Sequence, residues 1–218
     1  MDPSETEALL IPKTVDNTLK TYKTTEPEKH FLDDDNKQKS FLQKIDFIDK
    51  AYSNFIHFLE LPPVLEIPVY AFARIYNPDF MVCCFLIMFL YNAIQYKNYF
   101  FVVKPLLHVI LTLVVTVLSK YVIGRPRPDV PDNVHKMFNC RSKETNCSMP
   151  SGDAMQAGNI AVVLLYYFGS WIGFIFVPFV MFARIFYCCH YIMDTVVGAI
   201  TGIGLSIGIF ITLEMLFY

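Results

Sequence analysis

Residues 171–217 read WIGFIFVPFVMFARIFYCCHYIMDTVVGAITGIGLSIGIFITLEMLF, and this stretch decides the fold class. Almost every side chain in it is apolar. Its only acidic, basic or histidine residues are Arg184, His190, Asp194 and Glu214. The two apolar runs, 171–189 and 194–217, are each close to the roughly 20 residues that a helix needs to cross a bilayer. The stretch therefore predicts two membrane-spanning helices whose junction carries ionisable side chains.

Other apolar runs precede this stretch, at about 79–96, 99–121 and 154–169. Hydrophobic residues make up 54% of the chain and charged residues 17%, which is too apolar for a soluble domain of 218 residues. We therefore expect an all-α fold, a polytopic bundle of transmembrane helices that occupies residues 61–218. It has five spans, or six if the run 64–76 also crosses, although Glu66 and Arg74 make that run short and polar for a span.

The N-terminal part of the chain is polar. Residues 1–40 are rich in Lys, Asp, Glu and Thr, and such a composition predicts a disordered tail. Within 41–60, apolar residues fall at a helical spacing, at positions 41, 45, 48, 52, 55 and 59, which predicts an amphipathic helix in the membrane interface. Glu5 to Leu10 fits the acidic dileucine pattern of sorting-adaptor ligands, which requires a cytosolic tail. A net charge of -2, without a basic strip, excludes nucleic acid as a partner.

The order of the crossings brings the polar residues of the apolar domain to one face of the membrane. The span that ends near Lys120 and the span that begins near Asp153 are joined by the long polar loop 124–152, so both ends lie on the same face. The tight turn near residue 170 lies on the opposite face, and the next turn returns to the first face with the ionisable residues noted above. Long loops commonly carry function, so we expect a site on this face.

Two clusters on this face suit an anion. Lys120 and Arg127 stand in the run KYVIGRPRP, where two prolines and a glycine fix a bent backbone and an arginine offers a planar fork for phosphate oxygens. Ser151 and Gly152 open the next span, where free amides and the helix dipole favour an anion. Each cluster also has a purely structural interpretation: basic residues that stop transfer at a membrane exit, and helix capping by Ser151 or Asp153.

His190 and Asp194 form the third cluster, together with Arg184. Residues four apart lie on one side of a helix, so the carboxylate can hold one imidazole nitrogen and leave the other basic. A nucleophilic histidine or a general base needs this arrangement. A solitary histidine near a membrane interface is more often a packing residue, but ionisable groups in so apolar a stretch are functional candidates. We therefore interpret the face as a phosphate-handling site.

Three motifs together resemble a known family. Lys120 to Pro128 matches K-x6-R-P, Pro150 to Gly152 matches most of P-S-G-H, and Arg184 to Asp194 matches R-x5-H-x3-D. These resemble the three signature motifs of the type 2 phosphatidic acid phosphatase superfamily, which includes lipid phosphate phosphatases and vanadium haloperoxidases. The resemblance covers about residues 60–218, and the order and spacing of the motifs agree with it.

The resemblance implies a phosphohydrolase of lipid phosphates or diphosphates that uses neither a metal nor another cofactor. It implies that His190 attacks phosphorus to form a phosphohistidine, and that Asp194 orients the imidazole and stabilises its positive charge. It also implies that the phosphoryl oxygens are bound by Lys120, Arg127, Ser151, Gly152 and Arg184. The implied partners are the membrane and a phospholipid or isoprenoid phosphate substrate.

The second motif departs from the family pattern, because Asp153 stands where the family has a histidine, the expected acid for the departing oxygen. Ala183 likewise replaces the usual serine before Arg184. An aspartate with the reference pKa of about 3.9 is ionised and cannot donate a proton, although a nearby phosphate would raise that pKa. Either Asp153 serves as a protonated acid, or the substrate is a diphosphate such as a polyprenyl diphosphate, whose leaving group needs little protonation. The alternative is a catalytically silent relative, a membrane scaffold that binds lipids or partner proteins.

The number of spans decides on which side of the membrane the site lies. With six spans and a cytosolic tail the site is lumenal or extracellular, and with five it shares the side of the tail. The resemblance and the dileucine pattern both favour a lumenal or extracellular site, in the endoplasmic reticulum, an endolysosomal membrane or the plasma membrane. Cys140 and Cys147 lie in the loop on this face, and the sequence leaves open whether they form a disulfide or stay free.

Overall fold

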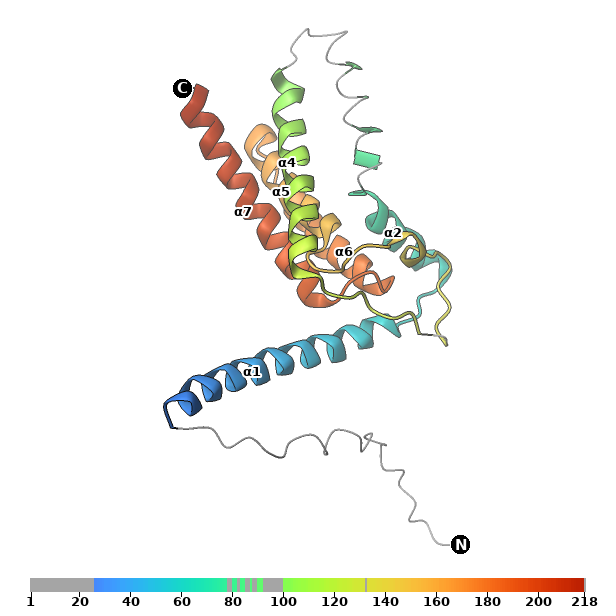
Figure 1. The fold of residues 1–218 in the computed structure, drawn as a ribbon. Coiled ribbons are helices and arrows are strands. Elements are labelled where there is room, and N and C mark those ends of the chain that lie inside the picture. Colours follow the sequence, from blue (N-terminus) through green and yellow to red (C-terminus); the bar gives the residue numbers. More distant parts are fainter. Residues whose placement is uncertain are drawn as a thin grey trace, which may run out of the picture. The chain divides into compact units, whose positions relative to one another are not determined.

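A computed structural model describes residues 26–77, 80, 81, 83, 84, 87, 90, 91, 100–131 and 133–217. Its contacts divide the chain into two units, Met1–Lys44 and Ile45–Tyr218. The described part of the first unit is the start of a helix, and the second unit holds a helix bundle (Figure 1). The Glu5 to Leu10 pattern lies outside the described residues.

The described residues form helices and loops, without a β-strand, which confirms the all-α prediction for this part of the chain. The helices are α1 (Glu26–His57), α2 (Pro63–Arg74), α4 (Phe100–Ile123), α5 (Gly152–Phe168), α6 (Ile172–Phe186) and α7 (Ile192–Phe217), with a short 3-10 turn at Arg141–Lys143. α1 thus begins before the predicted start at residue 41.

Within the described residues, two helices are long and apolar enough to cross a membrane: Val103–Ile123 of α4, with mean hydropathy 2.1, and Ile192–Met215 of α7, with mean hydropathy 2.2. The apolar part of α6 is shorter, at Ile172–Phe186. α2 has 12 residues, fewer than the roughly 20 that a span needs. Because the predicted span at 79–96 falls largely outside the described residues, the number of spans stays a prediction.

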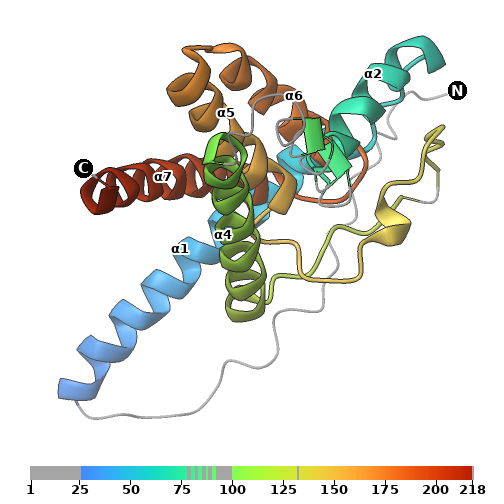
Figure 2. The ribbon, with the colours of Figure 1, turned by 90° about the horizontal axis from the view of Figure 1, so that it is seen from above.

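α5 is the central helix of the bundle and contacts α4, α6 and α7. Figure 1 shows α4, α5 and α7 running alongside one another, and in Figure 2 the other three helices lie around α5. Two glycines let α7 come this close: a Cβ on Gly198 would lie 2.5 Å from the Ser151 carbonyl oxygen, and one on Gly202 would lie 2.0 Å from that of Met155. Small residues permit such close backbone approach between membrane helices. The contact brings the start of α7 beside the start of α5.

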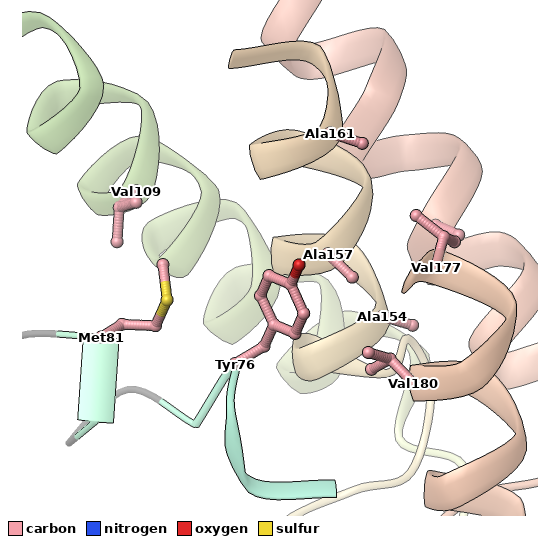
Figure 3. Close-up of a cluster of buried hydrophobic side chains, with 9 residues drawn as sticks. Tyr76, Met81, Val109, Ala154, Ala157, Ala161, Val177 and Val180 are labelled. Carbon is pink, nitrogen blue, oxygen red and sulfur yellow. The ribbon is translucent and has the colours of Figure 1, made fainter. Parts of the chain in front are cut away.

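The core between α5 and α6 is built from small side chains on α5. Ala154, Ala157 and Ala161 are buried and face Val177 and Val180 of α6 (Figure 3). On the other side of α5 lie Tyr76, Met81 and Val109, which close the same cluster (Figure 3). Because alanine adds little volume, α6 packs closely on α5 and its C-terminal end reaches the face where α5 begins.

The part of α1 that belongs to the second unit buries its polar side. Asp49, Ser53 and His57 are buried, whereas Phe47 and Phe55 are 73% and 78% exposed. A water-soluble surface helix has the opposite arrangement, with its apolar side buried. The outward side of this part of α1 is therefore the apolar one, and its place in the membrane interface stays a prediction.

Candidate active site

A cavity of about 340 Å³ opens where α4, α5 and α6 meet the loop 124–151. Five of the residues predicted from sequence line it: Lys120, Gly152, Asp153, Arg184 and His190. The remaining three predicted residues, Arg127, Ser151 and Asp194, are buried next to this lining. Helices far apart in the sequence thus bring the predicted residues together.

His190 lies in the turn between α6 and α7 and is 1% exposed. Arg127 Nη1 donates to its Nε2 over 3.2 Å, so Nε2 is unprotonated and its lone pair accepts this hydrogen bond. Burial lowers the pKa of His190 from 6.5 to about 3; the nearby Asp194 carboxylate opposes this shift, and the positive charges of Arg184 and Arg127 add to it. The imidazole is therefore neutral at pH 7, as a nucleophile must be.

Asp194 lies behind His190 and is held from two sides. Arg125 Nη1 lies 2.6 Å from its Oδ1, and the Tyr191 amide donates to its Oδ2 over 2.9 Å. The same Oδ2 lies 3.7 Å from Nδ1 of His190. That distance exceeds a hydrogen bond, and Nδ1 is buried without a hydrogen-bond partner. The two residues predicted from the spacing are thus neighbours, but this geometry has no hydrogen bond between them.

Glu144 binds both arginines of the site, although none of the three sequence motifs includes it. Its carboxylate forms ion pairs with Arg127, at 2.7 Å, and with Arg184. Burial tends to raise the pKa of Glu144, but the charges of Arg184 and Arg127 outweigh burial and lower it to about 2. An ionised carboxylate therefore occupies the position between two guanidinium groups where phosphate oxygens are expected.

Asp153 is the second carboxylate of the cavity. Its Oδ2 lies 2.9 Å from Nε of Arg184, an ion pair in which the N–H is not well directed at the oxygen. Arg184 also donates from Nη1 to the Ala73 carbonyl over 3.3 Å. The guanidinium of Arg184 is thus held between Asp153 on one side and Glu144 on the other.

Lys120 and Arg127 meet on Asn146, another residue that the motifs did not indicate. Lys120 Nζ donates to the Asn146 side-chain oxygen over 3.2 Å and to the Cys147 carbonyl over 2.9 Å. Arg127 donates from Nε to the Asn146 carbonyl over 2.7 Å and from Nη2 to its side-chain oxygen. The loop thus fixes both cations, of which Lys120 lines the cavity.

Ser151 performs the structural role that was its alternative in the sequence. Its side chain caps α5 and accepts from the Ala154 amide at 3.5 Å, while its own amide donates to the Asp194 carbonyl over 2.9 Å. The second contact links the start of α5 directly to α7. Ser151 is therefore held beside the site, and its Oγ already accepts the capping hydrogen bond.

Within the described ranges, no group of three or more His, Cys, Asp or Glu side chains could hold a metal ion.

The two cysteines of the loop do not form a disulfide. Cys140 and Cys147 are both free, which is one of the two alternatives that the sequence left open. Cys140 is buried, and Cys147 is partly exposed.

Comparison with known proteins bears on the same residues. The sequence profile of the PAP2 superfamily matches residues 101–218, which include every predicted site residue. A transmembrane phosphatidylglycerolphosphate phosphatase of PAP2 type from Bacillus subtilis has a similar fold, with a TM-score of 0.64 and 20% identity over 79% of this chain and 87% of that one. LpxE from Aquifex aeolicus gives a TM-score of 0.56 and 24% identity over 73% of this chain and 93% of that one. No curated protein sequence matches the chain at a significant level.

Proposed function

The chain belongs to the PAP2 superfamily, whose profile covers more than half of it, and on that premise we propose that it is an integral membrane phosphatase. Its substrate is a lipid phosphate or a polyprenyl diphosphate, and the reaction passes through a phosphohistidine at His190. The placement of His190 is the observation that carries this proposal. A neutral imidazole is buried between an anion, Asp194, and a set of cations that line a cavity.

In the proposed first step the substrate phosphate enters the cavity and its oxygens take the place of the Glu144 carboxylate on Arg127 and Arg184. Lys120 and the Gly152 amide bind the remaining oxygens. His190 Nε2 then attacks phosphorus, so a P–N bond forms while the P–O bond to the leaving group breaks. Asp194 accepts from Nδ1–H and stabilises the positive imidazole that results.

In the second step water attacks the phosphohistidine, which releases phosphate and restores the neutral imidazole. The cations that bound the substrate also stabilise the charge that develops on the phosphoryl oxygens in both steps. Fixed arginine and lysine side chains supply this charge in place of a divalent ion.

The ion pair between Asp153 and Arg184 bears on the leaving group. Burial raises the pKa of Asp153, although the positive charge of Arg184, whose Nε lies 2.9 Å from Oδ2, opposes this rise. A raised pKa favours the protonated carboxyl, which can donate to the departing oxygen. The alkoxide of a phosphomonoester needs such a donor, whereas a phosphate leaving group, as in a diphosphate, departs without one. We therefore propose Asp153 as the acid for the leaving group, and both phosphomonoesters and polyprenyl diphosphates stay candidate substrates.

Phosphate release by the purified protein, measured with phosphatidate, sphingosine phosphate and polyprenyl diphosphates, tests this function. Turnover of at least one substrate, abolished in His190→Ala and retained in Ser170→Ala, is the expected result. Absence of turnover with all of them would contradict the proposal.

One observation supports a second candidate, a silent relative that binds lipid headgroups or partner proteins. The ionised Glu144 already pairs with Arg127 and Arg184 and offsets part of the positive charge that would attract phosphate. For this candidate, the wild type would bind lipid phosphate without hydrolysing it, and Asp153→His would restore phosphate release.

We also propose where the protein lies in the cell. It is an integral protein of an endomembrane or of the plasma membrane, with the site on the lumenal or extracellular side, and Glu5 to Leu10 serves as a sorting-adaptor ligand. Labelling of Cys147, which is partly exposed in the loop, can show on which side of the membrane the site lies. In sealed vesicles of known orientation, a membrane-impermeant thiol reagent should label it only from the lumenal or extracellular side, and Cys147→Ser should remove that label.

A further inference from the structure

Three buried polar side chains lie on one side of α1. Asp49, Ser53 and His57 are spaced four residues apart and are 5%, 0% and 1% exposed. Residues at this spacing lie above one another on a helix. Buried polar groups need hydrogen-bond partners, so the identity of their partners shows what this side of α1 does.

Their partners are the residues from His190 onward. The Ile192 amide donates to Ser53 Oγ over 2.9 Å, and the Met193 amide donates to Asp49 Oδ1 over 2.9 Å. These are the first two residues of α7, and the first amides of a helix have no acceptor within it. α1 therefore caps α7 with side chains from a distant part of the chain.

The third contact reaches the proposed nucleophile itself. His57 Nε2 lies 3.3 Å from the His190 carbonyl, which can only accept, so the imidazole of His57 is the donor. The three side chains of α1 thus hold the main chain of the α6–α7 turn in sequence order, at residues 190, 192 and 193.

Asp49 is also connected to the side chain of Asp194. Its Oδ2 lies 2.8 Å from Arg125 Nη2, and the other terminal nitrogen of Arg125 lies 2.6 Å from Asp194 Oδ1. One carboxylate of α1 therefore fixes both the backbone of the turn and, through Arg125, the acid that orients His190.

We infer that Asp49, Ser53 and His57 are positioning residues that set the alignment of His190 with Asp194. This inference rests on the proposed function of His190. The 3.7 Å between Nδ1 of His190 and Oδ2 of Asp194 shows why alignment matters: a shift of the turn by a few tenths of an ångström decides whether they form a hydrogen bond. Through these contacts α1 positions the turn that carries His190, although it lies outside all three motifs.

Steady-state kinetics of Ser53→Ala and Asp49→Asn test the inference. We expect kcat to fall on the order of tenfold to a hundredfold, because small displacements of reacting groups cost that much. KM and the inhibition constant for orthovanadate should stay nearly constant, because the loop residues Asn146 and Cys147 hold the cations that bind phosphate. Ser53→Thr keeps the hydroxyl acceptor and should restore kcat.

Two matched substitutions serve as controls. Ser170→Ala removes a hydroxyl in the α5–α6 connection, and Asp129→Asn removes an exposed carboxylate of the loop. Both should keep the wild-type kcat. Melting temperatures separate an effect on positioning from an effect on folding. If Ser53 positions the turn, Ser53→Ala has a reduced kcat even when it is assayed well below its melting temperature, where it is fully folded.

Two results would overturn the inference. An unchanged kcat in Ser53→Ala and Asp49→Asn, beside normal wild-type turnover, would leave the proposed function intact and show that α1 is only structural. A parallel rise of KM and of the vanadate inhibition constant would show that α1 acts on phosphate binding instead. A wild-type protein without turnover on any substrate would overturn the proposed function and this inference together.

Discussion

Oδ2 of Asp153 lies 2.9 Å from Nε of Arg184, so the carboxylate that replaces the family's histidine is paired with a cation of the proposed phosphate site. The other side of the same guanidinium binds Glu144. Arg184 is thus shared between two carboxyl groups before any substrate enters. The departure from the family pattern therefore affects the contacts of this cation as well as the supply of protons.

Removing the proton donor at position 153 should change the choice of substrate. We expect Asp153→Asn to lower kcat for phosphatidate on the order of a hundredfold, the usual effect of a positioned acid, and to lower it much less for a diphosphate. Asp153→His is the matched control, because it keeps a proton donor at this position. Equal losses in both variants, or equal losses on both substrates, would contradict this role.

Removing the Glu144 charge should strengthen phosphate binding. In Glu144→Gln the carboxylate no longer competes for Arg127 and Arg184, so the inhibition constant for inorganic phosphate should fall. A fall on the order of fivefold corresponds to about 1 kcal/mol for an ion pair of this kind. Inhibition assays on Glu144→Gln and on the loop control Asp129→Asn give the comparison. A constant that stays unchanged or rises in Glu144→Gln would show that Glu144 helps to build the site instead.

The low pKa of His190 predicts a pH dependence of stability. In the unfolded chain this imidazole takes up a proton as the pH falls through 6.5, whereas in the folded protein it does so only near pH 3. The unfolded state therefore binds more protons between these values, and acid lowers stability by up to about 1.4 kcal/mol for each pH unit. Melting temperatures at pH 8, 6 and 5 should fall more steeply for the wild type than for His190→Gln, which cannot titrate at this position. Parallel curves would contradict the assignment of a neutral, buried His190.

The close approach of α7 to α5 should depend on Gly202. A Cβ at this position would lie 2.0 Å from the Met155 carbonyl oxygen, whereas one at Gly204 meets nothing within 4 Å. We expect Gly202→Ala to destabilise the protein by roughly 1–3 kcal/mol, the usual cost of overpacking, and to reduce activity because the start of α7 carries Asp194. Gly204→Ala on the same helix should be nearly neutral. Similar melting temperatures for the two variants would contradict this packing.

The sequence predicted the features that depend on local pattern. Apolar runs predicted the helices α4 to α7, and the order of crossings placed Lys120, Asp153 and His190 at one cavity. Ser151 had two interpretations, and the structure shows the capping contact. The role of His190 in turnover stays a prediction.

The sequence did not reveal contacts that join distant segments without a periodic pattern. Glu144 is one acid in a mixed loop, and only the folded loop shows that it pairs with Arg127 and Arg184. The polar side of α1 was identified from its spacing, but an amphipathic pattern does not tell which side meets protein and which meets lipid. Asp49 and its partner Arg125, far apart in the chain, were therefore not connected with Asp194.

The most direct test of the central claim is to trap the phosphorylated enzyme. Purified protein is mixed with substrate that carries radiolabelled phosphate, stopped in alkali during turnover, digested, and the labelled peptide identified. The account predicts label on His190 that is stable to alkali and lost in acid, present in Ser170→Ala and missing in His190→Ala. Turnover without any protein-bound phosphate, or label that persists in His190→Ala, would contradict it.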